Sequence, residues 1–163
     1  MVVSTDVSHL LALWAHFYGR TTAVSATVTY LHLGGVLLGG GVAIAADAAT
    51  LRLSPETGPD STRELDRLAA VHRWVVAGLT LIFASGVVMM LAKVGSVATS
   101  PVFWVKMGLV VLLIGNGYAR LRVEVALRQG SAARWGWFRR TSIASLALWF
   151  LILLAGTLLH ATV

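Results

Sequence analysis

Four long apolar stretches alternate with short polar segments along the chain. They cover residues 22–46, 68–92, 101–119 and 141–160. An α-helix needs about 20 apolar residues to cross the hydrocarbon core of a bilayer, and each stretch reaches that length. No stretch alternates apolar and polar residues as a strand would. The pattern predicts an all-α integral membrane protein, a four-helix bundle in which residues 1–163 form a single transmembrane domain.

A shorter amphipathic segment, residues 5–18, precedes the first apolar stretch. At helical spacing its large apolar side chains share one side, namely Leu10, Leu13, Trp14 and Phe17. It is too short to cross a bilayer, and its polar positions include His9 and His16. We expect a short N-terminal helix that lies in the membrane interface.

Composition and charge agree with a membrane protein and predict its orientation. Hydrophobic residues make up 57% of the chain and charged residues only 12%, with a net charge of +6. Ten arginines flank the connections between spans one and two and between spans three and four: Arg52, Arg63, Arg67, Arg73, Arg120, Arg122, Arg128, Arg134, Arg139 and Arg140. Cytoplasmic loops are rich in Arg and Lys, so both termini should lie outside the inner membrane of a bacterium. The basic surplus then contacts anionic lipid, and no nucleic-acid partner is expected.

The first span carries an imidazole above a run of glycines. In a helix, Gly35 and Gly39 lie on the same face as His32, one to two turns further along. Such a face allows another helix to approach closely, or it leaves room for a flat cofactor held by the histidine. Ionisable groups at this depth are costly and are functional candidates by default. The sequence leaves both interpretations open.

Further candidate ligands are spread over the other spans. Lys106 lies five residues into the third span, where its ammonium either reaches the nearer surface or serves the site. His72, His160 and His16 lie near span ends and are the remaining candidate ligands. In one arrangement His32 binds haem b, with His72, His160 or Lys106 as the sixth ligand or with Lys106 beside a propionate. In another, His16, His32, His160 and an outer methionine bind copper.

The residues that are absent narrow the function classes. The chain has no cysteine, which excludes disulfides, iron–sulfur clusters and thiolate nucleophiles. The only carboxylate near a span interior is Asp47, which we place at the end of the first span, so a proton-coupled transport relay is not expected. No nucleotide-binding motif is present. Asn116 in the third span is expected to hydrogen bond to a neighbouring helix.

Three segments between Tyr30 and Gly117 carry a family resemblance: LHLGGVLLGGGVAIAADAATLR, RLAAVHRWVVAGLTLIFASGVVMML and SPVFWVKMGLVVLLIGNG. They resemble small bacterial four-helix membrane proteins of the copper-resistance D-type and HemJ-like group. The resemblance implies a tetrapyrrole or copper site, with His32 before small residues and Lys106 after an aromatic segment. The arginine–tyrosine–histidine segment that follows the first span in HemJ-like proteins is replaced here by AADAATLR.

These observations together favour a haem b-binding membrane protein of electron transfer, a small cytochrome or a cytochrome-like subunit. If the protein is an enzyme, it should be a membrane oxidoreductase that acts on a quinone or a porphyrinogen. Copper binding or transport is one alternative, and a non-catalytic subunit of a larger membrane complex is another. A homodimer or a larger complex in membrane lipid, with quinone as a possible partner, is compatible with each of these functions.

Overall fold

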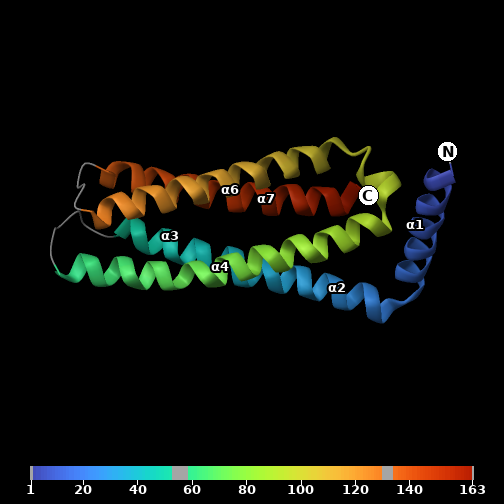
Figure 1. Ribbon diagram of the computed structural model, residues 1–163, viewed down its shortest axis with the longest axis horizontal. Coiled ribbons are helices and arrows are strands. Elements are labelled where there is room, and N and C mark those ends of the chain that lie inside the picture. The colour runs from blue at the N-terminus through green and yellow to red at the C-terminus, as the bar shows by residue number, and fades with distance from the viewer. Residues whose placement is uncertain (1, 53–58, 130–133, 163) are drawn as a thin grey trace.

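The computed structural model describes residues 2–52, 59–129 and 134–162, and all of its long elements are helices (Figure 1). In chain order they are α1 (Val2–Arg20), α2 (Thr22–Gly35), the π-helix η1 (Val36–Gly41), α3 (Val42–Arg52), α4 (Pro59–Ala92), α5 (Val94–Val97), α6 (Pro101–Arg128) and α7 (Trp135–Thr162).

Four helices are long and apolar enough to cross a membrane, which confirms the predicted all-α four-span bundle. They are Thr22–Arg52, Val71–Ala92, Pro101–Leu127 and Trp135–Thr162, the first being α2, η1 and α3 in series. Each of the four helices extends beyond the apolar stretch that predicted it. Asp47 was expected to mark the end of the first span, but the helix continues to Arg52 and Asp47 is only 1% exposed. A carboxylate can occupy that position because a cation from another helix pairs with it, as described below.

The four spans form two packed pairs. The α2–η1 segment packs along α4, and α6 packs along α7, while α3 joins the pairs by packing against both α7 and α4. The main hydrophobic core lies where α3 meets α6 and α7, and its buried members are Ala43, Leu113 and Trp149. Large apolar side chains elsewhere on the spans are exposed, as expected for surfaces that face lipid.

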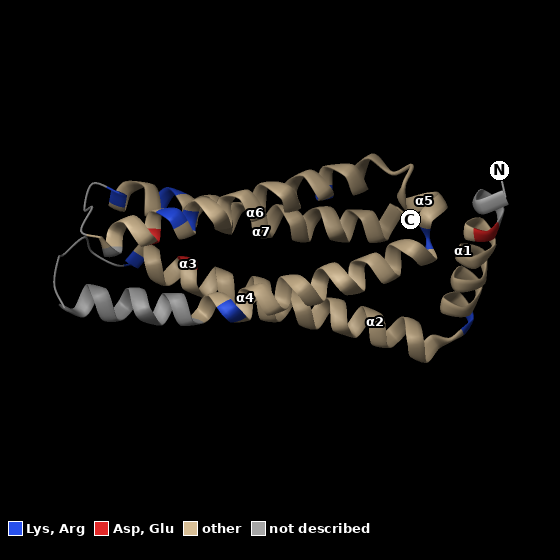
Figure 2. Cartoon of the chain, in the orientation of Figure 1, with Lys and Arg blue, Asp and Glu red and all other residues tan. Residues whose placement is uncertain are grey.

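The two ends of the bundle differ in charge. Both termini lie at one end, which we call the terminal end (Figure 1). At the opposite end, which we call the loop end, α3 and α6 finish and α4 and α7 begin. Lys and Arg gather near the loop end of α3, α6 and α7 (Figure 2). Arg20 ends α1 and Lys93 follows α4, so both belong to the terminal end. This is the asymmetry on which the predicted orientation depends.

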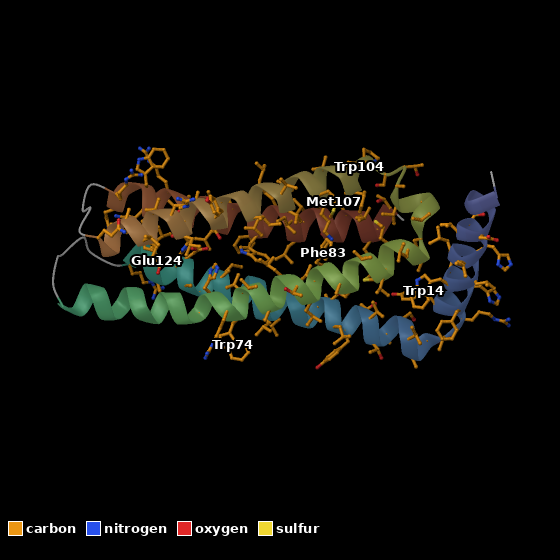
Figure 3. All side chains as sticks on the ribbon, viewed as in Figure 1. Trp14, Trp74, Phe83, Trp104, Met107 and Glu124 are labelled. Carbon is orange, nitrogen blue, oxygen red and sulfur yellow. The ribbon has the colours of Figure 1, made fainter. Side chains whose placement is uncertain are left out.

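Helix α1 lies across the terminal end and contacts α2 and α4 (Figure 1). Its Trp14 indole nitrogen donates a hydrogen bond to the Val88 carbonyl of α4 at 3.2 Å, and Figure 3 shows this side chain beside α4. Leu10, Leu13 and Phe17 are at least half exposed on the same helix. An exposed apolar face on a helix that crosses the bundle end suits a position in the membrane interface.

Candidate functional site

His32 projects from α2 toward α4, where Ser85 orients it. The Ser85 hydroxyl, which is buried, donates its hydrogen to the Leu81 carbonyl at 2.6 Å. Its oxygen must therefore accept from the His32 imidazole, whose Nδ1 lies 3.0 Å away. In the neutral imidazole this leaves the Nε2 lone pair free to bind a ligand. A histidine ligand of a metal characteristically donates its other ring N–H to an oxygen in this way.

Lys106 reaches α7 from α6. Its Nζ lies 3.5 Å from the position that a Cβ would take at Gly156 of α7. Within the described part of the chain, Lys106 forms no hydrogen bond and no ion pair. An ammonium without a counter-charge in a spanning helix suits a ligand that carries an anionic oxygen.

Two glycines that the sequence analysis did not single out lie beside these side chains. A Cβ at Gly86 of α4 would lie 3.5 Å from the His32 ring, and Gly156 lies beside Lys106. Neither glycine is within van der Waals overlap of its neighbour, so each leaves space that a larger residue would fill. Gly86 thus leaves space beside the Cε1–Nδ1 edge of the His32 ring, and Gly156 leaves space beside the Lys106 ammonium.

Gly35 and Gly39, the predicted cofactor-binding glycines, have a different environment. A Cβ at Gly35 would meet Ile82 Cγ1 at 2.9 Å, and a Cβ at Gly39 would meet the Gly78 backbone at 3.2 Å. In turn, a Cβ at Gly78 would overlap the backbone of Gly39. These glycines therefore bring α2–η1 and α4 together, which is the packing alternative of the sequence analysis. They leave no space between these two helices for a flat cofactor.

The other predicted ligands do not join His32. His16, His72 and His160 are exposed. His72 precedes Ser85 by 13 residues on α4, or about 20 Å along the helix axis, and Ser85 is the residue that contacts His32. In residues 2–52, 59–129 and 134–162 no three His, Asp or Glu side chains come together as a metal site. A site on His32 therefore has one imidazole among the predicted ligands.

A second polar centre lies nearer the loop end, and the sequence analysis missed it. The Arg120 guanidinium of α6 forms an ion pair with Asp47 of α3. It also donates to Ser142 Oγ and to Thr50 Oγ1, both at 3.0 Å, and covers the Phe138 ring at 5.0 Å. Both hydroxyls can accept because each donates its own hydrogen to a backbone carbonyl of its helix. The centre therefore links α3, α6 and α7 through one ion pair and two hydrogen bonds of the same guanidinium.

Asn116 extends this polar centre by one turn of α6. Its side-chain amide donates a hydrogen bond to the Thr141 carbonyl of α7 at 2.9 Å, which confirms the expected bond between helices. A signal for the Arg120 centre was present in the chain, because Asp47 follows His32 by 15 residues and Arg120 follows Lys106 by 14. Parallel spans with similar spacings bring such residues to similar depths.

Comparison with protein-family models, with curated proteins and with solved structures finds no match to this chain. The functional argument therefore depends on the chemistry of the His32 site itself.

Proposed function

We propose that this multi-pass membrane protein binds haem b through His32 and takes part in electron transfer. The observation that supports this most is the hydrogen bond from His32 Nδ1 to Ser85, because it fixes the ring and leaves Nε2 as the ligand atom. A histidine nitrogen is a standard axial ligand of haem iron. Haem b, when bound, supplies a one-electron redox couple inside the membrane.

Lys106 serves the same site as the charge partner of a haem propionate. Its ammonium is half-buried, lies beside Gly156 and has no carboxylate partner in the described chain, so an acidic group of the ligand would neutralise it. Charge-assisted contacts of this kind are about twice as strong as neutral hydrogen bonds. His16, His72 and His160 have no part in this proposal, since none of them lies with His32.

The protein's partner in this role is a redox carrier in the membrane, and a quinone fits the apolar surroundings. The resemblance to the copper-resistance D-type and HemJ-like group, which implies a tetrapyrrole or copper site, is part of the basis of this proposal. Copper has less support, because His32 lacks a second histidine nearby and the described His, Asp and Glu residues form no cluster of three.

Haem titration of the detergent-purified protein tests the proposal. The unmodified protein should develop a Soret band that saturates at one haem per chain, and His32→Ala should abolish it. His72→Ala and His160→Ala are matched controls, since both remove an exposed histidine from a span end and should bind like the unmodified protein. Saturable binding in His32→Ala, or no binding in the unmodified chain, would refute the assignment.

We further propose that the protein lies in the inner membrane of a bacterium with its loop end in the cytoplasm. The chain lacks cysteine, so a single cysteine reports its own position. Gln129→Cys at the loop end should be shielded from an impermeant thiol reagent in spheroplasts, while Thr162→Cys at the terminal end should be labelled. The reverse pattern would show that the arginine-rich end faces outward.

A further inference from the structure

The first span is held by its neighbours at two points. Asp47 pairs with Arg120 of α6, and His32, which lies 15 residues earlier on the same span, bonds to Ser85 of α4. In an α-helix, one residue more or fewer between these two points would rotate His32 relative to Asp47 by about 100° and displace it by about 1.5 Å.

The π-helical segment η1, Val36–Gly41, lies between His32 and Asp47. A π-helical turn closes its hydrogen bond over five residues in place of four, so it accommodates one residue more than an α-helical turn. The extra residue therefore sets the rotation of His32 relative to Asp47, and with it both the bond to Ser85 and the ion pair to Arg120 form from one span.

Neighbouring helices hold this segment on two sides. Gly39 packs against the Gly78 backbone of α4, and Gly40 packs against the Trp149 ring of α7 at 3.0 Å from its Cβ position. Toward the loop end the helix is fixed by the buried Asp47–Arg120 ion pair, and toward the terminal end by the bond from His32 to Ser85. The extra residue is thus confined between two anchored parts of one span.

We propose that η1 and the Asp47–Arg120 ion pair are positioning elements that set the register at which His32 meets Ser85. Asp47 and Arg120 touch no ligand in this account, and they act on the site through the helix. The inference rests on the proposed function for the use of the His32 site, but its geometric claim does not require haem.

Deletion of one residue from η1 tests the register. Leu37 in this segment is 76% exposed, so its deletion removes few packing contacts. The deletion should leave the first span regular and misalign His32 from Ser85 while Asp47 remains paired with Arg120. Deletion of Thr27, an exposed residue on the other side of His32, is the matched control because it leaves the spacing from His32 to Asp47 unchanged.

Cross-linking reads the register without haem. The parent chain has no cysteine, so the variant His32→Cys with Ser85→Cys carries only these two thiols, and a short bifunctional thiol reagent should cross-link them. Cross-linked cysteines no longer react with a maleimide–polyethylene glycol conjugate. The fraction of chains that this conjugate leaves unmodified is therefore the cross-linking yield. The Leu37 deletion should abolish this protection, and the Thr27 deletion should retain it. Full protection after the Leu37 deletion, or none in the parent pair, would overturn the proposal.

A second set of variants tests whether the Asp47–Arg120 ion pair fixes the rotation of α3. Replacing both partners by apolar residues, Asp47→Leu with Arg120→Met, avoids leaving a buried charge unpaired and is compatible with folding. In this background the Leu37 deletion should again permit cross-linking, because α3 is released to rotate. Continued loss of cross-linking would remove the ion pair from the mechanism. Circular dichroism of each variant establishes that the helices are retained.

Haem titration of the same deletions, with His32 and Ser85 intact, connects the register to the site. Haem binding should be lost with the Leu37 deletion, retained with the Thr27 deletion and restored by the apolar double replacement. If the unmodified chain binds no haem but the cross-linking pattern holds, the proposed function fails and the register survives. If haem binding withstands the Leu37 deletion, the positioning role fails and the proposed function survives.

Discussion

The two polar centres of this bundle differ in how completely their groups are used. Near the loop end, Asp47 and Arg120 neutralise each other, and one hydroxyl from α3 and one from α7 each accept a guanidinium hydrogen. Nearer the terminal end, His32 has one ring nitrogen bound and one free, and Lys106 has no ion-pair partner in the described chain. Buried polar networks stabilise a fold when every group is satisfied. The difference indicates that the Asp47–Arg120 centre holds the helices together, whereas the His32–Lys106 site has capacity left for a ligand.

The largest expected effect comes from removing one partner of the Asp47–Arg120 ion pair. Asp47→Ala leaves the Arg120 guanidinium buried without its counter-charge and should destabilise the bundle by about 3–5 kcal/mol. Thermal unfolding in detergent measures this loss. The paired replacement Asp47→Leu with Arg120→Met should recover most of it, because no unpaired charge remains. A melting temperature unchanged by Asp47→Ala would show that the ion pair is not structural.

A smaller loss should follow from separating α2 and α4. Gly78→Ala places a methyl group against the Gly39 backbone and should cost about 1–3 kcal/mol, the usual range for overpacking. Gly115→Ala on α6 is the control, since no atom lies within 4 Å of its Cβ position. It should be neutral or stabilising by up to about 1 kcal/mol through helix propensity. Equal melting temperatures for the two variants would contradict the close approach of these helices.

Ser85→Ala should affect the ligand site more than the fold. It removes the oxygen that fixes the His32 ring, and loss of such a partner lowers the affinity of a histidine for its metal by roughly 10–100-fold. Haem titration gives the dissociation constant. Thr80→Ala is a matched control, because its hydroxyl also donates to a carbonyl within α4 but is exposed. Unchanged haem affinity in Ser85→Ala would mean that the hydrogen bond does not orient the ligand atom.

The smallest effect concerns charge at the same site. Lys106→Met keeps a long apolar side chain, so haem should remain bound. The reduction potential should fall by roughly tens of millivolts, because a cation at a partly solvated distance contributes on the order of 1 kcal/mol. The direction follows from charge: loss of a neighbouring cation favours the more positive, oxidised iron. A potentiometric titration of both proteins measures the reduction potential. A higher potential in Lys106→Met than in the unmodified protein would contradict the placement of Lys106 at the haem site.

Hydrophobic pattern predicted the fold well because spanning a membrane demands long apolar helices, and those are visible in any one sequence. The individual site residues His32 and Lys106 were visible for a similar reason, since ionisable groups stand out in apolar spans. The residues that lie beside His32 could not be predicted from the sequence. Ser85 and Gly86 look like ordinary small residues of α4 until packing brings them beside His32.

Two other features depended on information that local patterns lack. Asp47 resembled a boundary residue because its partner, Arg120, is 73 positions further along the chain. The glycines of the first span predicted close approach or a cofactor slot equally well, and only the position of Gly78 distinguishes them. A π-helical turn has no simple periodic signature, so η1 was also missed.

Replacing His32 with glycine and supplying imidazole in solution is the most direct test of the claim that this side chain binds haem through its free nitrogen. His32→Gly removes the ligand and leaves a hole of its shape beside Ser85 and Gly86. The account predicts that this variant shows no Soret band with added haem, and that imidazole restores the band and its saturation at one haem per chain. Haem binding by His32→Gly without imidazole, at the affinity of the unmodified protein, would contradict the account.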